Sequence, residues 1–493
     1  MQMSDFWTIR RGGILTLETR NLAMPGNPRY QPKEMVPYFG YDNLYRAVAE
    51  VEFANLQVLG EIGVIPSAEI ALLTDEVMTA ILDIPTTVID KTERKITKHD
   101  IQAWRMEARK LADPSLGRWM HVILTSYDPL DTARVLQFVR VYHEVMRPSL
   151  SELISLLADI VRRNSDVLQI GRTHGQFALP ITAGFWLATI LSRILYNVGE
   201  ADRHCDQMVG KISGAVGAYN AQVGLGITER CGDKPFEDRV LEKLGLKSAR
   251  ISTQILPPEY LASFLHDLHL LSACFGQLGR DCRHLMRSEI AEVCEPFSAE
   301  QSGSSTLAAK RNPINFEGLE GDWQKVKCEY HKVQEGMISE HQRDLVGSRV
   351  ARDFPVIPIL LQGQLDVLLR KDDHGVPFMQ RIRIDPDACQ RNFLKAAPIA
   401  LAEPLYIALQ MAGLDGDAHK FVNHTLTPVS LATGQLLVEV LEGLVKDDEE
   451  LERVYQSIPA EIRDLLHHPE QYTGLACQKA LEIADLALTY VKS

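Results

Sequence analysis

The sequence predicts an all-α fold built around a central bundle of long helices. Between residues 260 and 286, apolar residues recur at spacings of three and four, which places them on one face of a helix. Similar patterns cover residues 135–161 and 185–208. No segment alternates apolar and polar residues as a half-buried strand does, except for residues 380–384. Long helices with wide apolar faces favour an antiparallel bundle that also buries surface against other subunits.

Local sequence signals agree with these helices. Pro257 and Pro258 precede the helix predicted over 260–286 and suit a first helical turn. At 1.5 Å per residue, a helix of about 25 residues extends roughly 40 Å. Pro148 lies inside the pattern over 135–161, where a proline removes a backbone donor and bends the helix. We therefore expect a kink at Pro148.

The chain is long enough for two or three domains, since 493 residues exceed the size of one ordinary core. We expect an N-terminal helical domain over residues 1–124, a central long-helix bundle over 125–370 and a C-terminal helical domain over 371–493. Pro355, Pro358 and the polar turn that follows separate the last two.

Composition predicts a cytoplasmic enzyme. The formal net charge of −13 argues against general binding to nucleic acid or membranes, so an anionic substrate needs locally clustered cations. The eight cysteines have no C-x-x-C spacing and lie in apolar surroundings, which is typical of reduced thiols. We find no apolar run of membrane-spanning length and no signal peptide.

Residues 301–317 form the segment richest in chemistry. Ser304 and Ser305 provide hydroxyls beside a glycine, and Lys310 and Asn312 provide donors a few residues later. Such a segment can surround an anion and place a hydroxyl against it. The alternative is a surface loop beside a basic turn.

The rest of the chain decides between these two interpretations. Eight further segments also match motifs of one protein family, and they occur in the same order as in that family. The nine are residues 27–35, 97–103, 121–133, 171–180, 210–217, 252–254, 303–317, 341–352 and 468–474. Together they resemble the adenylosuccinate lyases of the fumarase/aspartase superfamily. That resemblance implies an all-α, three-domain lyase without a metal or other cofactor. It also implies a homotetramer in which three subunits complete each active site.

The reaction that the resemblance implies is β-elimination of fumarate from adenylosuccinate, giving AMP, and from the succinylated aminoimidazole carboxamide ribotide. A base must remove a proton from carbon, donors must stabilise the developing carboxylate dianion, and an acid must protonate the departing nitrogen. The resemblance assigns these roles to Ser304 as base, His174 as acid, Glu317 as the carboxylate that orients His174, and Lys310 and Asn312 as donors.

The substrate of such an enzyme also carries a phosphate, for which guanidinium groups are suited. The resemblance places substrate contacts at Arg29, Tyr30, Lys98, His99, Asp100, His121, Thr125, Ser126, Thr173, Gln254, Ser305, Arg343, Ser348 and Arg352.

Departures from the family pattern concern the substrate more than the reaction. They are Ile123, the 254–259 segment, Leu307-Ala308, Gln342 and Arg349. One alternative is a related lyase or cycloisomerase acting on argininosuccinate, fumarate or a carboxymuconate. Another is a structural homologue without catalysis. Retained Arg29, Ser348 and Arg352 favour a phosphate-bearing substrate.

A pair of histidines at helical spacing raises the alternative of a zinc site. His266 and His269 share a helical face, but the sequence offers no carboxylate or cysteine partner, so we predict no zinc there.

Overall fold

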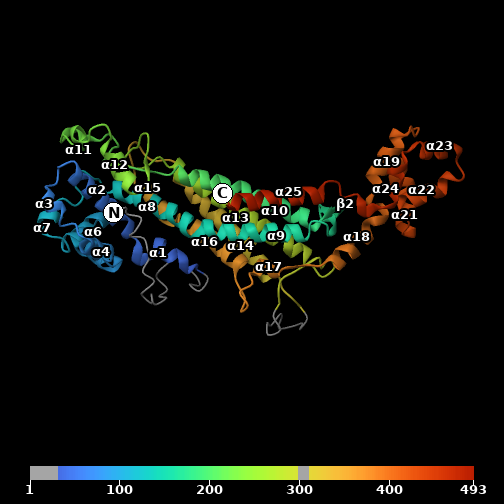
Figure 1. Cartoon of the computed structure of the whole chain (residues 1–493), viewed down its shortest axis with the longest axis horizontal. Helices are drawn as coiled ribbons and strands as arrows, with labels where there is room; N and C mark the ends of the chain where they lie inside the picture. Colours follow the sequence, from blue (N-terminus) through green and yellow to red (C-terminus); the bar gives the residue numbers. More distant parts are fainter. Residues whose placement is uncertain (1–30, 298–309, 493) are drawn as a thin grey trace. The chain divides into compact units, whose positions relative to one another are not determined.

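The computed structural model describes residues 31–297 and 310–492. Within these ranges α-helices dominate, and the strands form only two-stranded sheets (Figure 1). The predicted all-α class is confirmed. The longer helices not discussed individually are α4 (Asp75–Leu82), α12 (Phe236–Lys243), α16 (Val356–Leu369), α24 (Ala460–His467) and α25 (Ala476–Lys492).

The described residues divide into two compact units. Unit 1 comprises those of Met1–Leu150, Asn197–Ala273 and Gly321–Asp366. Unit 2 comprises those of Ser151–Tyr196, Cys274–Glu320 and Val367–Ser493. Several long helices cross from one unit to the other along the chain, so each unit collects segments that are distant in sequence. The three-domain division expected from the sequence stays a prediction.

The long helices begin and end close to where the apolar periodicity places them. α13 covers Glu259–Leu285 and starts directly after the two prolines, while α10 covers Ala183–Asp206 (Figure 1). α14 follows at Ile314–Glu335. Buried leucines and phenylalanines along α13 confirm that its apolar face packs in the interior.

The helix predicted over residues 135–161 is interrupted before Pro148. α8 (Tyr127–Val141) runs into a π-turn, Tyr142–Met146, which continues as α9 (Arg147–Arg163). The Arg147 N–H donates to the Tyr142 carbonyl, five residues back, instead of the usual four. Because Pro148 has no N–H to offer the preceding turn, the wider turn is the local solution. The helix is irregular where a kink is expected, and the kink itself stays a prediction.

The prediction that strands are confined to residues 380–384 was wrong. β1 (Leu168–Thr173) and β2 (Gln176–Thr182) form an antiparallel hairpin with an irregularity between Ile170 and Arg172. Most of β2 is exposed or half-buried, so the hairpin lacks the apolar alternation that reveals a strand.

The expected strand over 380–384 is only partly formed. Its first residues belong to the helical turn α17 (Phe378–Arg381), and only β6 (Arg383–Ile384) is extended. β6 pairs antiparallel with β5 (Val293–Cys294), just before the polar 301–317 segment. A third pair, β3 (Val209–Gly210) and β4 (Lys247–Ser248), is parallel.

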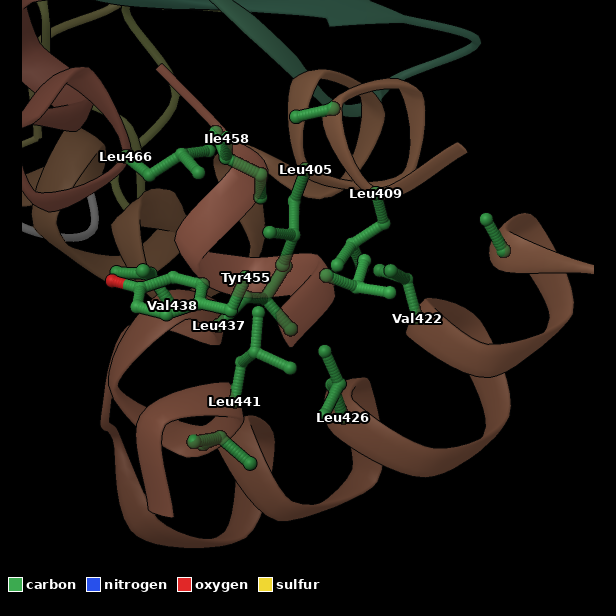
Figure 2. Packing of buried hydrophobic residues seen from close by; sticks show 14 of the residues in the cluster. Leu405, Leu409, Val422, Leu426, Leu437, Val438, Leu441, Tyr455, Ile458 and Leu466 are labelled. Carbon is green, nitrogen blue, oxygen red and sulfur yellow. The ribbon is translucent and has the colours of Figure 1, made fainter. Parts of the chain in front are cut away.

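The C-terminal helices enclose an apolar cluster of their own. Figure 2 shows Leu405, Leu409, Val422, Leu426 and Leu441 pointing toward one another. They come from α19 (Ala402–Met411), the turns after α20 (Ala418–Phe421), and α22 (Leu437–Val445). Asp448 caps the next helix, α23 (Glu449–Ser457), by accepting from two backbone N–H groups.

In the described ranges, no single helix has both the length and the apolar composition to cross a membrane, whereas the bent pair Ala418–Thr433 and Leu437–Val445 passes that test jointly.

Candidate active site

The predicted site residues separate between the two units. Unit 1 holds Lys98, His99, Asp100, His121, Thr125, Ser126, Gln254, Arg343, Ser348 and Arg352. Unit 2 holds Thr173, His174, Lys310, Asn312 and Glu317. Arg29, Tyr30, Ser304 and Ser305 lie outside the described residues. Most of the described groups predicted to bind substrate therefore belong to unit 1, whereas the predicted acid His174 and the substrate contact Thr173 belong to unit 2.

Arg343 is the centre of a polar cluster in unit 1. Its guanidinium donates to Gln254 Oε1 at 2.6 Å and to Ser348 Oγ at 3.3 Å. It also lies over the Tyr127 ring, and the Tyr127 hydroxyl shares a short hydrogen bond with Ser348. The Gln254 N–H donates to the Gln342 carbonyl, which ties the two segments together. Three predicted substrate contacts thus meet at one place.

Tyr127 is a member of this cluster that the sequence did not reveal. It follows Thr125 and Ser126 at the position that the motif leaves variable, so the motif gave no reason to select it. Its side chain is buried and starts α8. A flat ring under a guanidinium restrains the orientation of the donor fork.

A second group of predicted residues meets around His99. Its Nε2 lies 3.2 Å from Ser126 Oγ, and its Nδ1 lies 3.1 Å from Asp100 Oδ1. Lys98 precedes it in a left-handed conformation, with a φ of 54°, and ends the preceding helical turn. His99 then leads into α6 (Asp100–Arg109). The 97–103 and 121–133 segments are therefore adjacent, as a common binding site requires.

A buried ion pair stabilises the 121–133 segment. Lys211 and Asp128 are both fully buried and in close contact. Asp128 also accepts from the backbone N–H groups of Thr125 at 2.7 Å, Ser213 at 3.1 Å and Gly214 at 3.2 Å. Asp128 thereby connects the predicted substrate contact Thr125 to the 210–217 segment.

A pocket with a volume of about 100 Å³ adjoins the Arg343 cluster in unit 1. Tyr127 and Ser348 form part of its wall, and most of the remaining wall is apolar. Asp131 also lines it and accepts from Arg134 Nη1 and from the Leu256 N–H, both at 3.0 Å. Burial raises the pKa of the Asp131 carboxyl above its usual range, and Arg134 opposes that shift.

Arg352 lies in the 3₁₀ turn Ala351–Asp353 that follows α15 (Val346–Val350). It is exposed, one turn beyond Ser348. Its charge acts on the half-buried phenol of Tyr45, where it opposes the rise in pKa that burial causes.

In unit 2, His174 occupies the tip of the β1–β2 hairpin. Thr173 pairs with Gln176, so His174 and Gly175 form a two-residue loop with φ values of 54° and 78°. Positive φ at both positions is the mark of a type I′ turn, which a residue other than Gly, Asn or Asp adopts at some cost. His174 is exposed there. A tight turn thus projects the predicted acid away from its own sheet.

The base of this hairpin is fixed by Glu292, a fully buried carboxylate. It accepts from Gln169 Nε2 at 2.8 Å, from the Arg172 guanidinium at 2.7 Å and from Asn392 Nδ2 at 2.9 Å. Asn392 comes from α18 (Pro386–Ala400). This network satisfies the buried charge and holds β1 in place.

The residues after the undescribed 298–309 segment lead into α14. Glu295 accepts from the backbone N–H groups of Asn315 at 3.0 Å and Phe316 at 2.9 Å, so it caps this helix. Burial raises the pKa of Glu295. Gly279 of α13 allows the close approach, because an added Cβ would lie 2.5 Å from the Phe316 carbonyl oxygen. The start of α14 is thus rigidly placed.

Glu317 is exposed on the first turn of α14, and Lys310 is exposed at the start of the described segment. Within the described part of unit 2, no hydrogen bond joins Glu317 to His174. The predicted pairing of these two residues stays a prediction.

The rings of His266 and His269 pack against Tyr330, with His269 stacked at 5.1 Å between centroids. Burial lowers the pKa of His269. In the described ranges, no group of three or more His, Cys, Asp or Glu side chains is placed to hold a metal ion.

Comparison with known proteins gives a family. A family model described as "Lyase" matches residues 62–327. The chain is 30% identical over 475 residues to the adenylosuccinate lyase of Pyrococcus abyssi, covering 95% of this chain and 98% of the relative. It is 29% identical over 460 residues to that of Archaeoglobus fulgidus, covering 93% and 97%.

Solved structures agree on the fold. The 3-carboxy-cis,cis-muconate lactonizing enzyme from Pseudomonas putida superposes with a TM-score of 0.75 at 22% identity, covering 94% of this chain and 98% of the other. The fumarate lyase from Mesorhizobium sp. BNC1 also gives 0.75, at 21% identity, covering 94% and 100%. With its order of motifs and its matches over nearly the full length, the chain belongs to the adenylosuccinate lyase family of the fumarase/aspartase superfamily.

Proposed function

We propose that this chain is a C–N lyase that eliminates fumarate from adenylosuccinate, giving AMP, and from the succinylated aminoimidazole carboxamide ribotide. The full-length relatives carry the name of this activity. The observation that carries the assignment to this chain is the Arg343 cluster, in which a stacked guanidinium, Ser348 and Gln254 converge. Convergent donors of this kind suit an anionic group on a flat substrate.

In the proposed reaction, Ser304 removes a proton from the carbon next to a carboxylate of the succinyl group. The electron pair left on carbon forms the double bond of fumarate as the C–N bond breaks. His174 donates a proton to the departing nitrogen. Lys310 and Asn312 stabilise the dianionic carboxylate, and Lys310 with backbone N–H groups stabilises the serine alkoxide.

The site is proposed to form between copies of the chain in a homotetramer. His174 is exposed at a hairpin tip, which leaves it accessible to another copy of the chain and supports sharing. Arg29 and Arg352 are proposed to hold the phosphate, with Ser348 adding a neutral hydrogen bond. A cytoplasmic location is proposed because all eight cysteines are free thiols.

The function is tested by product analysis. Purified protein is incubated with adenylosuccinate, and AMP and fumarate are quantified separately by chromatography and proton NMR. Equal amounts of both products are expected, and Ser304→Ala should slow the formation of both by at least roughly 10²-fold. A folded protein that forms neither product from adenylosuccinate contradicts the proposal.

A further inference from the structure

Both carboxylate oxygens of Glu52 form hydrogen bonds with His121. Oε2 accepts from the His121 backbone N–H at 2.9 Å, and Oε1 lies 2.6 Å from His121 Nδ1. Glu52 belongs to α2 (Arg46–Glu61) and is completely buried, while the His121 side chain is 6% exposed. Two contacts from one buried carboxylate fix both the backbone and the ring of this histidine.

The backbone that carries His121 is itself unusual. His121 has a φ of 68° and Ile123 a φ of 61°, a region that costs free energy for side chains of this kind. A second residue of α2, Asn55, is also buried and donates to the Val122 carbonyl at 3.2 Å. α2 therefore holds the 121–123 turn by two side chains in a conformation that it would not adopt alone.

The chemistry of the contact determines the state of the ring. An ionised carboxylate only accepts hydrogen bonds, so Nδ1 must carry the hydrogen in both the neutral and the protonated imidazole. The cations near this carboxylate are on α6. The negative charge of Glu52 acts on the guanidinium of Arg109, which donates hydrogen bonds to the Arg118 and Met120 carbonyls. Only Nε2 can then change its protonation, and it makes no hydrogen bond within the described part of the chain.

We propose that Glu52 is a positioning residue for the reaction: it locks His121 in the Nδ1–H form and reserves Nε2 for the substrate. The inference rests on the proposed function, because only the family resemblance places His121 at the substrate. A carboxylate behind a histidine serves this purpose in many sites where one ring nitrogen must be kept available.

Glu52→Gln is the decisive variant because it keeps the shape and changes the donor pattern. The His121 backbone N–H can only donate, so the single oxygen of the new side-chain amide must face it. The amide NH₂ then faces Nδ1, which must become the acceptor. The neutral ring is thereby forced into the Nε2–H tautomer while the fold is kept.

Two measurements are made on the full-length protein. ¹⁵N NMR of the histidine rings, with His121 assigned by its loss in His121→Asn, should show protonated Nδ1 in wild type and protonated Nε2 in Glu52→Gln. With adenylosuccinate, kcat/KM of Glu52→Gln should fall by roughly 10- to 100-fold, as for other lost partners of a functional histidine. The melting temperature should change little.

Glu50→Gln is the matched control. Glu50 lies on the same helix, is also buried, and pairs with Arg140 at 2.7 Å. Its substitution tests the general effect of a neutral amide in α2, and kcat/KM should stay close to wild type. His121→Asn covers the case in which Glu52→Gln does not fold. Asn accepts positive φ and can donate to Glu52, but it has no Nε2, so activity should fall to a similar extent.

The results that test the role of Glu52 can be distinguished from the result that tests the proposed lyase activity. A wild-type ring protonated at Nε2 overturns the inference whether or not adenylosuccinate is cleaved. Unchanged kinetics in Glu52→Gln with a switched tautomer also overturn it. An equal loss in Glu50→Gln reduces Glu52 to a structural residue. Failure of wild type to cleave adenylosuccinate contradicts the proposed function, and leaves the tautomer measurement to test the lock on its own.

Discussion

The guanidinium of Arg343 lies over the ring of Tyr127, 3.5 Å from its centroid, and both side chains contact Ser348. Gln254 completes the group from a segment about 90 residues away in sequence, through a 2.6 Å hydrogen bond to Arg343. The donor fork is thus oriented before any ligand arrives, which lowers the entropy lost on binding.

Arg343→Lys should raise KM for adenylosuccinate by roughly 10- to 100-fold, the equivalent of one charge-assisted hydrogen bond. Lysine keeps the charge but loses the fork and the stacking on Tyr127. Steady-state kinetics measure the effect. Arg349→Lys is the control, because Arg349 is an exposed cation on α15, a few residues after Arg343, and should leave KM unchanged. An Arg343→Lys enzyme with wild-type KM removes this cluster from the substrate site.

Ser304→Ala and His174→Ala should each lower kcat by at least roughly 10²-fold, since each removes an acid–base group. His174 is exposed on a hairpin tip, so its loss should not affect folding. Rapid-quench and steady-state assays with adenylosuccinate give the values. Near-normal turnover in Ser304→Ala moves the base elsewhere, and Ser305→Ala is then the next variant to measure.

The same two variants test whether sites are shared. Light scattering should give a tetramer. Mixing and reassembling the two inactive variants should restore part of the activity, because some sites then combine an intact Ser304 with an intact His174 from another subunit. A stable, active monomer, or a mixture without any recovery, contradicts a shared site.

Lys211→Met should destabilise the protein by about 3–5 kcal/mol, because it leaves the Asp128 charge buried without its partner. Chemical denaturation monitored by circular dichroism measures the change. Lys234→Met is the matched control. Its ion pair with Glu242 is exposed, and such pairs contribute about 0–1 kcal/mol. Similar losses in both variants would mean that Asp128 and Lys211 do not anchor the 210–217 segment.

Asp131→Asn should flatten the dependence of stability on pH. Burial raises the pKa of Asp131 in the folded state, so the folded chain binds the proton more tightly than the unfolded chain. Stability from this group is complete below the unfolded pKa of about 3.9 and is lost as pH rises through the raised value. The new side chain in the Asn variant does not titrate, so the variant does not lose this stability as pH rises. It can keep the Leu256 N–H bond, while Arg134 turns to solvent.

Unfolding free energies of wild type and Asp131→Asn are compared between about pH 4 and pH 8, a range that spans the unfolded pKa. The difference, variant minus wild type, should become more positive with rising pH. A difference that is constant or that falls with pH means that Asp131 is not held in a raised-pKa state.

The long helices could be predicted because their signal is local. A stripe of apolar residues at spacings of three and four identifies α13 and α10 to within two residues at their starts, since the same stripe is what the helix buries. The β1–β2 hairpin could not be predicted. It is held by Glu292 and Asn392 from distant segments and not by an apolar face, so its own residues show no alternation.

Some residues of the candidate site could likewise be predicted from the sequence, and others could not. Motif order pointed to Arg343, Ser348 and Gln254 one by one, and their contact is a product of the fold. Tyr127 and Glu52 were missed. Tyr127 occupies a variable motif position, and Glu52 acts on His121 from 69 residues away, on a helix whose sequence reads as ordinary core.

The central claim is that this lyase acts on a succinyl compound that carries a phosphate. It is tested most directly by the ratio of kcat/KM for adenylosuccinate to that for argininosuccinate, which has the succinyl group without the phosphate. We predict a preference for adenylosuccinate of at least about 10³-fold, because polar groups of the site that are left without their ligand reject an analogue strongly. Arg29→Ala and Arg352→Ala should reduce that ratio. Faster turnover of argininosuccinate, or an Arg29→Ala enzyme with unchanged adenylosuccinate kinetics, would contradict the account.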